Sequence, residues 1–167
     1  MSDVARAIGV SHAALYRHYD SKAALRKAVV ERWIHAAIPL LQEVVESGES
    51  VEKRLYHWLD TLRMFKRERA RKDPELFTMY AALVAEIEGV LEHHIELLLK
   101  QLVSIIEDGM SSGTFAKGDA RQAAEAVLLS TSRFHHAAHA SEWEWPDADS
   151  RFDAVWELIR CGLAART

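Results

Sequence analysis

The stretch GVSHAALYRHYDSK, residues Gly9–Lys22, decides how the start of the chain is expected to fold. Gly9 tolerates the positive φ that a tight turn between helices often requires. Ser11 has the side chain of a helix N-cap, and the residues after it predict a helix to about Tyr19. Residues 2–8 predict a short helix ahead of the turn. The segment therefore predicts two short helices joined by a tight turn.

Three residues in this segment have the spacing of a helix-turn-helix. Ala5 is small where the first helix meets the second, Gly9 lies in the turn, and Leu15 is apolar on the inner side of the second helix. The second helix then turns its polar N-terminal face outward, which is the face that enters the major groove of DNA. By spacing alone, an ordinary amphipathic helical hairpin with a polar outer face fits nearly as well.

The residue types on that outer face suit contacts with DNA. Arg17 can pair bidentately with guanine or contact phosphate, and the small Ala13 and Ala14 allow close approach to a thymine methyl group. Tyrosine, histidine and lysine side chains nearby suit phosphate oxygens. The candidate DNA-binding residues are Ser11, His12, Ala13, Ala14, Tyr16, Arg17, His18 and Lys22.

A longer pattern around this segment resembles the TetR family of bacterial transcriptional regulators. The pattern is A-x-x-x-G-V-S-x-x-x-L-Y-x-H-Y-x-S-K-x-x-L, which runs here from Ala5 to Leu25. The resemblance implies an all-α homodimer with a DNA-binding head and a hollow body that binds a small molecule. It also implies that bases are faced by His12, Ala13, Ala14 and Arg17, and phosphates by Tyr16, His18 and Lys22.

The sequence departs from the family pattern at its start. In the family a further helix precedes this motif and completes a three-helix head, and a threonine caps the motif's first helix; both would fall upstream of Met1. We therefore expect residues 1–32 to be an incomplete helix-turn-helix head that runs into a connecting helix. We expect residues 33–167 to be the ligand-binding and dimerisation domain. The 167-residue form should bind DNA more weakly than a form extended by such a helix.

Composition places the chain among soluble helical proteins. Apolar residues make up 49% and charged residues 28% of the 167 residues, and only 3 Pro and 7 Gly interrupt them, which favours long helices. No apolar run approaches the roughly 20 residues that span a bilayer, and no leader opens the chain. The single cysteine, Cys161, excludes an intramolecular disulfide and a cysteine-based zinc site. We expect a cytoplasmic protein.

The charge is unevenly distributed along the chain. The net charge is −4, but residues 1–32 hold six Lys or Arg against three acids, which leaves that segment at +3 and the remainder at −7. A basic head on an acidic body suits a head that meets phosphates.

The fold class expected from helical periodicity is all-α, a truncated helix-turn-helix head followed by a larger helical domain. Breaks at glycines, prolines and capping residues set the expected boundaries. The expected helices run from Asp20 or Ser21 toward Val45 with a kink at Pro39, from Ser50 to Asp73, from Pro74 to about Met110 with a bend near Gly89, from Asp119 to about Ala140, and from Ser150 to Ala165.

Aromatic, methionine and histidine side chains gather on the expected middle helices. Such residues at helical spacing usually form a plain core, but the resemblance implies a hollow body, so we expect a mixture of core and pocket. The effector should be a small apolar or aromatic molecule. The candidate pocket residues are Trp58, Leu62, Phe65, Met79, Tyr80, Phe134, His135 and His139.

The basic run Arg63–Lys72 is interpreted as a solvated helix end.

The sequence gives little support for metal binding or catalysis. His135 and His139 are spaced to share a helix face, as two metal ligands can be, but no His-Glu-x-x-His or Glu-x-x-His pattern accompanies them. We predict no metal and no cofactor. No Gly-x-Ser-x-Gly motif or glycine-rich phosphate loop occurs either, so we predict no enzymatic activity.

The last two expected helices carry apolar stripes that predict assembly. We expect them to pair with their counterparts in a second subunit as a four-helix bundle. The stripes consist of Ala124, Val127, Leu128, Phe134, Phe152, Val155, Trp156, Ile159 and Leu163.

The favoured function is therefore a one-component transcriptional repressor that binds operator DNA and is released by a small apolar ligand. The alternative is a helical small-molecule-binding dimer without functional DNA binding. A helical-bundle enzyme is a distant third.

Overall fold

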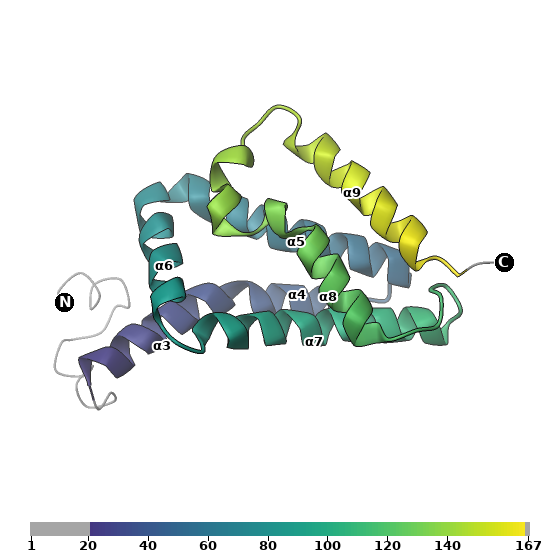
Figure 1. Ribbon diagram of the computed structural model, residues 1–167, viewed down its shortest axis with the longest axis horizontal. Coiled ribbons are helices and arrows are strands. Elements are labelled where there is room, and N and C mark those ends of the chain that lie inside the picture. The colour runs from purple at the N-terminus through teal and green to yellow at the C-terminus, as the bar shows by residue number, and fades with distance from the viewer. Residues whose placement is uncertain (1–20, 166–167) are drawn as a thin grey trace.

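Helices make up nearly all the regular structure of this protein, for which a computed structural model describes residues 21–165 (Figure 1). The predicted helices of residues 2–8 and 11–19 lie outside this range. The described helices are α3 (Lys22–Ile34), α4 (Ile38–Val45), α5 (Val51–Lys72), α6 (Pro74–Glu86), α7 (Val90–Ser111), α8 (Ala120–Ser130) and α9 (Ala148–Leu163), with short 3₁₀ turns η1 (His35–Ala37), η2 (Ser132–Phe134) and η3 (Ala137–Glu142).

Capping residues begin three of these helices, because the first N–H groups of a helix lack partners within it. The Ser21 hydroxyl accepts a hydrogen bond from the Ala24 N–H at 3.0 Å at the start of α3. Asp73 caps α6 and Asp119 caps α8 in the same way. The predicted caps at Ser21 and Asp119 are thereby confirmed. Ser50 occupies the N-cap position of α5, but its side chain makes no capping hydrogen bond.

Three predicted helices differ from the structure at their boundaries. The helix expected to kink at Pro39 is instead interrupted by η1, and Pro39 lies in the first turn of α4, where its missing N–H costs no hydrogen bond. The helix expected from Pro74 to Met110 is two helices, because Gly89 adopts φ 77° between them. That left-handed conformation ends helical hydrogen bonding and suits only glycine well.

The helix expected to reach Ala140 ends at Ser130, so that prediction is wrong. The Ser130 and Thr131 hydroxyls each donate to the Val127 carbonyl oxygen at 2.9 Å. Such local side-chain bonds offer the backbone an alternative to the helical ladder. The chain continues through η2 and η3 instead, so His135 and His139 do not share an α-helical face.

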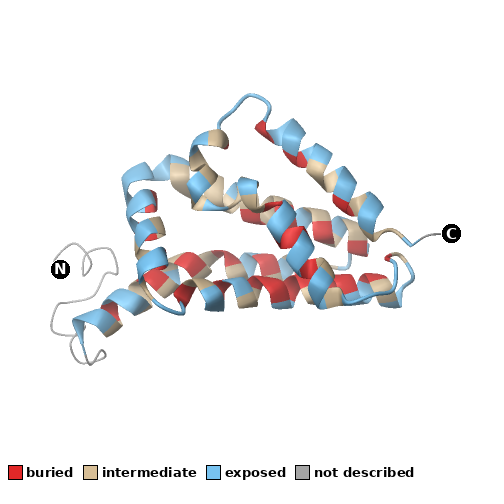
Figure 2. Cartoon of the chain, in the orientation of Figure 1, coloured by how far each residue is buried: buried red, intermediate tan, exposed pale blue. Residues whose placement is uncertain are grey.

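Two apolar clusters hold the helices together. Figure 2 colours the buried residues of these helices red. The larger joins α4, α5, α7, α8 and α9 around side chains that are fully buried, among them Leu55, Trp58 and Leu102. The smaller joins α3, α6 and the start of α7 through Val30 and Tyr80. The connecting helix α3 therefore packs on its own small cluster, beside the main core.

The apolar stripes predicted to form a dimer interface also pack within the chain. All nine stripe residues belong to the larger cluster or pack against it, and Phe152 and Ile159 are buried there, whereas Val155, Trp156 and Leu163 are only partly buried. The periodicity identified which faces are apolar, but it could not tell a partner subunit from the chain's own core. Within residues 21–165, no helix is long and apolar enough to span a membrane.

Candidate ligand-binding site

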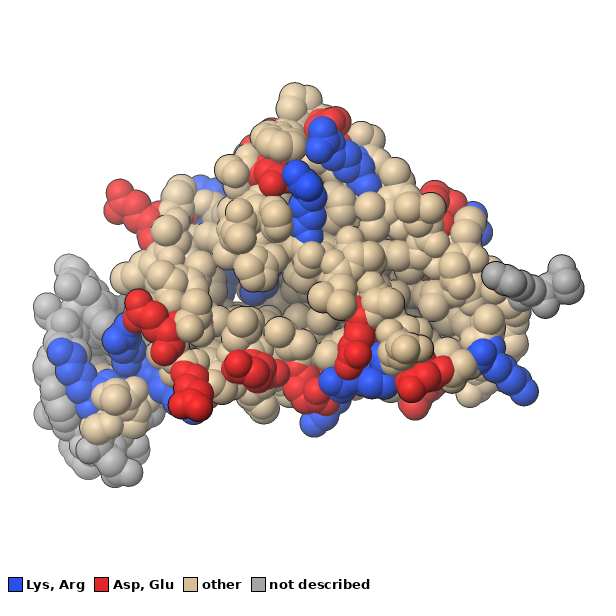
Figure 3. Space-filling model, viewed as in Figure 1, with Lys and Arg blue, Asp and Glu red and all other residues tan. Residues whose placement is uncertain are grey.

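A cavity of about 530 Å³ lies between the two apolar clusters. Its walls come from the end of α3, from α5, α6, α7 and α8, and from the segment that follows α8. Figure 3 shows a hollow in this face of the molecule with the atoms of Lys or Arg side chains at its bottom. The volume lies within the range of small-molecule sites. The walls are mainly apolar and include Ile34, Leu62, Phe77, Val84, Leu98 and Leu128.

Lys66 is the charged group inside the cavity. It follows Leu62 by one turn of α5, and its Nζ lies 5.7 Å from the centroid of the Trp33 ring. No carboxylate among residues 21–165 lies within ion-pair distance of this ammonium group. Burial, with the nearby charge of Arg69, lowers the pKa of Lys66 to about 8. The side chain is therefore still mostly charged at neutral pH, although the cavity disfavours that charge.

Two histidines complete the polar part of the wall. His94 on α7 is only 4% exposed, and its Nδ1 has no hydrogen-bond partner in the described part of the chain; the same is true of the His135 Nε2. Burial, reinforced by the charge of Lys66, lowers the pKa of His94 to about 2 and that of His135 to about 4. Both rings are consequently neutral at physiological pH and have hydrogen-bonding capacity to spare.

The one arginine at the rim of the cavity is already paired with two carboxylates. Arg121 on α8 donates to both carboxylate oxygens of Glu96 at 2.8 Å, and its Nε donates to Glu125 at 2.8 Å. Lys66 is thus the one cavity cation within residues 21–165 that has no carboxylate beside it.

The end of α3 is tied directly to the cavity wall. Trp33 stacks on Tyr80 with ring centroids 5.0 Å apart and meets Phe77 edge-on at 5.6 Å. Arg69 lies over the Trp33 ring, and its Nη1 donates to the Trp33 carbonyl oxygen at 2.7 Å. Arg69 is one turn beyond Lys66 on α5. The end of α3 therefore contacts the cavity directly through Trp33 and Ile34 and is also held to α5 by Arg69.

Two of the eight predicted pocket residues, Leu62 and His135, line this cavity. Trp58 is fully buried in the larger cluster, and its Nε1 donates to Gln101 Oε1 at 3.0 Å. The other five do not line the cavity. On α5 and α6, Phe65 faces Arg69, Met79 is exposed and Tyr80 stacks on Trp33. In η2 and η3, which follow α8, Phe134 packs on Phe152 and His139 contacts Glu142. Of the candidate DNA-binding residues, Lys22 begins α3 and is exposed, and the other seven lie outside the described range.

The sequence carries a pattern that marks Lys66 and His94 as candidate site residues. Lys66 continues the buried stripe of Leu59 and Leu62 at helical spacing on α5, and His94 precedes Leu98 on the buried face of α7. A polar residue in an apolar stripe must either find a partner or face a cavity. That rule marks both positions as candidates for a site.

The basic run Arg63–Lys72 was predicted to be a solvated helix end, but several of its side chains make specific contacts. Arg63 and Arg67 reach Asp149 at the start of α9, and Arg67 also pairs with Glu144. Lys66 enters the cavity and Arg69 binds the end of α3. The run therefore splits over three faces of α5.

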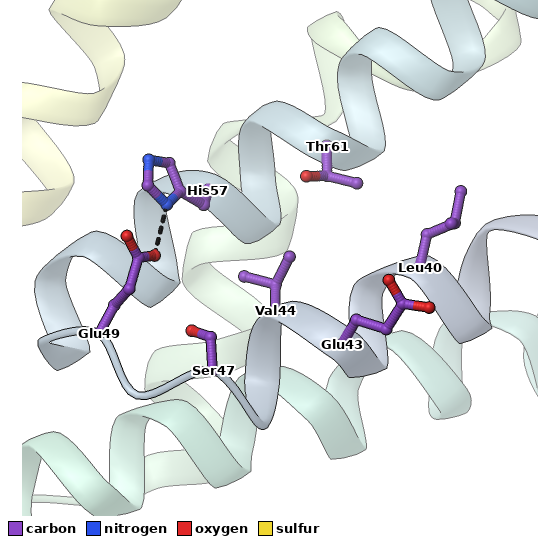
Figure 4. Close-up of a pocket in the computed structure, with 7 residues that line it drawn as sticks. All are labelled: Leu40, Glu43, Val44, Ser47, Glu49, His57 and Thr61. Atoms are coloured by element: carbon purple, nitrogen blue, oxygen red, sulfur yellow. Dashed lines mark hydrogen bonds and ion pairs between the residues drawn. The ribbon is translucent and has the colours of Figure 1, made fainter.

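Figure 4 shows a second hollow, which lies between α4 and the first half of α5. It is shallow, and it contains one polar pair, His57 Nδ1 and Glu49 Oε2, which are 2.6 Å apart. The Ser47 hydroxyl, which also lines it, has no hydrogen-bond partner in the described part of the chain. Leu40, at 43% exposure, is its largest exposed apolar side chain. This hollow offers a ligand less burial than the central cavity. Among residues 21–165, no group of three or more His, Cys, Asp or Glu is arranged to hold a metal ion.

Comparison with known proteins identifies what this arrangement belongs to. The family model described as "Bacterial regulatory proteins, tetR family" matches residues 1–29, and the one described as "Tetracyclin repressor-like, C-terminal domain" matches residues 51–156. The nucleoid occlusion factor SlmA of Marinobacter nauticus is 26% identical over 164 residues, which cover 93% of this chain and 80% of that protein. An uncharacterized HTH-type transcriptional regulator of Mycobacterium tuberculosis is 30% identical over 99 residues, 59% of this chain and 46% of its own length.

Two solved structures share the fold. E. coli NemR in its reduced form superposes with a TM-score of 0.69 at 16% identity and covers 99% of this chain and 86% of its own. FadR from Bacillus subtilis, in complex with stearoyl-CoA, gives a TM-score of 0.67 at 16% identity, with 97% and 87% covered. The all-α prediction is thereby confirmed. The chain belongs to the TetR family of transcriptional regulators, which are DNA-binding helix-turn-helix proteins and not enzymes.

Proposed function

We propose that this protein is a one-component cytoplasmic repressor that binds operator DNA and releases it when a small molecule fills the central cavity. In this proposal residues 1–32 are the head and the start of the connecting helix, and residues 33–167 bind the ligand and dimerise. One observation carries it: α3, which follows the helix-turn-helix motif directly, contributes Trp33 and Ile34 to the cavity wall.

A ligand can change the position of α3 only if it binds one position more tightly than another. Trp33 holds α3 to the small cluster by stacking on Tyr80 and by one hydrogen bond from Arg69. In this proposal α3 has one position in which these contacts are made and another in which they are broken. A ligand that displaces the Trp33 ring would loosen both contacts together. The neighbouring FadR fold, solved in complex with stearoyl-CoA, supports a ligand-binding role for this body.

The DNA-binding half of the proposal is tested by titrating the protein against a palindromic site near its own gene and against random DNA. The titration compares two versions of the protein. One is the 167 residues, and the other is extended by a helix taken from the in-frame codons upstream of Met1, where those codons encode one. The extended version should prefer the palindrome, with affinity falling steeply as salt rises. Equal affinity for both DNAs would leave the alternative, a ligand-binding dimer without functional DNA binding.

Replacing Arg17 with alanine in the extended version should cost about 1–3 kcal/mol of operator affinity and relax specificity at one base pair, because Arg17 is proposed to read a base. Fluorescence anisotropy against single-base variants of the site measures both effects. Lys22→Ala is the comparison, since a phosphate contact should weaken binding to all sequences equally. An Arg17→Ala loss that is uniform across sequences would contradict the base-reading role.

We propose further that α8 and α9 form a homodimer through the faces that the chain itself leaves exposed. Leu129 on α8 and Leu158 on α9 are 73% and 75% exposed, the highest values among the exposed large apolar residues. The small Ala126 and Ala154, each one turn earlier, are also exposed and allow close helix approach. This face differs from the stripes that were predicted from the sequence, which also pack within the chain.

Leu158→Glu should convert the dimer to a monomer, because it places a charge in the centre of that face. Sedimentation or light scattering at micromolar concentration should show a mass falling from twice 18.9 kDa to 18.9 kDa. Leu40→Glu is the matched control, since Leu40 is an exposed leucine on α4, away from this face. A native mass of one chain, or an unchanged mass for Leu158→Glu, would contradict the interface.

A further inference from the structure

We propose that the cavity takes a monocarboxylate with an apolar body, and that the Lys66 ammonium group binds the carboxylate. This inference rests on the proposed function, because it names the chemical class of the effector. It depends on three observations: an apolar cavity, one cation inside it with no carboxylate beside it, and two buried imidazoles with unpartnered nitrogens.

The empty cavity is unfavourable for Lys66. The Lys66 side chain is partly exposed to solvent, but its ammonium group has lost hydration without gaining an ion pair, and its lowered pKa reflects that loss. A ligand carboxylate restores the missing partner inside a low-dielectric space, where an ion pair is stronger than in water. The site is therefore built to favour a negative head group over a neutral one.

The histidines limit the charge that the head group can carry. His94 and His135 are neutral, so they offer hydrogen bonds but no second positive charge. A doubly charged phosphate would leave one charge uncompensated in an apolar space, which is costly. One ammonium group and two neutral imidazoles match a single carboxylate.

The rest of the wall determines the body of the ligand. Leu62, Leu98 and Leu128 belong to different helices and face the same space as Lys66. Burying an apolar chain or ring there contributes roughly 25 cal/mol per Å² of apolar surface. The head group gives orientation, and the apolar body gives most of the affinity.

Decanoate, decanol and inorganic phosphate test the inference by calorimetry and by thermal shift. The native protein should bind decanoate with its melting temperature raised, bind decanol at least tenfold more weakly, and not bind phosphate. Lys66→Met keeps the length of the side chain and removes its charge. This variant should lose at least tenfold in decanoate affinity and keep or improve its decanol affinity.

Lys53→Met is the matched control, because Lys53 is an exposed lysine on the same helix, outside the cavity. It should bind decanoate as the native protein does. Decanol binding as tightly as decanoate, or Lys66→Met retaining full decanoate affinity, would overturn the inference and leave an uncharged effector in the same cavity. If neither ligand binds, the inference also fails, whereas the preference for operator DNA is decided separately by the DNA titration.

Proton uptake gives a readout that a purely structural role of Lys66 would not produce. Near pH 8 about half of Lys66 is uncharged in the empty cavity, and a bound carboxylate raises its pKa, so binding should take up protons. Calorimetry in two buffers of different ionisation enthalpy measures this uptake, which Lys66→Met should abolish.

The other charged or titratable groups that face or border Lys66 are Arg69 on α5, His35 in η1, His93 and His94 on α7, Arg121 and Glu125 on α8, and His135 and His136 after α8.

Discussion

Replacing Trp58 with alanine should lower the free energy of unfolding by about 3–5 kcal/mol, the range for large buried aromatic side chains. Trp58 is fully buried at the centre of the larger cluster, where α4, α5 and α7 meet. The change removes the indole and leaves the Gln101 Oε1 atom without its N–H donor. The Gln101 side chain also donates to Ile38 and Gln42 on α4, so the loss extends to two helices. Urea unfolding followed by circular dichroism measures the change.

Two further variants separate packing from hydrogen bonding at this position. Trp58→Phe keeps much of the buried area but leaves the Gln101 acceptor unpaired, which should cost about 1–3 kcal/mol. Trp145→Ala removes a tryptophan that is 42% exposed and lies beside Arg151, and should cost much less than Trp58→Ala. If Trp58→Ala lowers the free energy of unfolding no more than Trp145→Ala does, Trp58 does not lie at the centre of the core.

Arg69→Ala should uncouple the cavity from the head while leaving the ligand bound. Arg69 is the residue of α5 that holds the Trp33 carbonyl and covers its ring, and it does not line the central cavity. Coupling energies between sites are typically about 1–3 kcal/mol, a 5–150-fold change in affinity. In the extended protein, decanoate should weaken operator binding by a factor in this range, and in Arg69→Ala by much less.

The control for this experiment is Arg71→Ala on the same helix, since Arg71 is 68% exposed on its side chain and its nearest acid is Glu144 at 3.8 Å. Arg71→Ala should keep the full effect of decanoate. Retention of the full effect in Arg69→Ala, with decanoate affinity unchanged, would show that the Trp33 contact does not carry the coupling.

The helices could be predicted because their ends are marked by local chemistry. Asp73 and Asp119 cap helices by bonds to N–H groups three residues later, and those signals need no knowledge of tertiary structure. The bend predicted near Gly89 is a full break between two helices, and the helix after Asp119 ends early, at Ser130. Neither outcome was predicted, because each depends on what the backbone does at one residue. A glycine permits a left-handed φ and a Ser or Thr permits a local hydrogen bond, but neither residue requires it.

The cavity could not be located from the sequence, because helical periodicity gives the buried face of a helix and not what covers that face. Trp58 and Lys66 lie on the same stripe of α5, eight residues apart, yet one meets the packed core and the other meets empty space. After the break at Gly89, α6 and α7 run in different directions, as Figure 1 shows. Both helices contribute residues to the wall of the cavity that Lys66 enters. The same limit applies to the stripes of α8 and α9, because periodicity does not tell a partner subunit from the chain's own core.

Coupling between the cavity and the head is measured by the operator affinity of the extended protein with and without saturating decanoate, at one salt concentration. We expect operator affinity to be about 5–150-fold weaker with decanoate, and decanoate affinity to weaken by the same factor when operator DNA is bound, because coupling is reciprocal. An unchanged operator affinity while decanoate raises the melting temperature would show an occupied cavity without control of the head. That result would contradict the proposed mechanism.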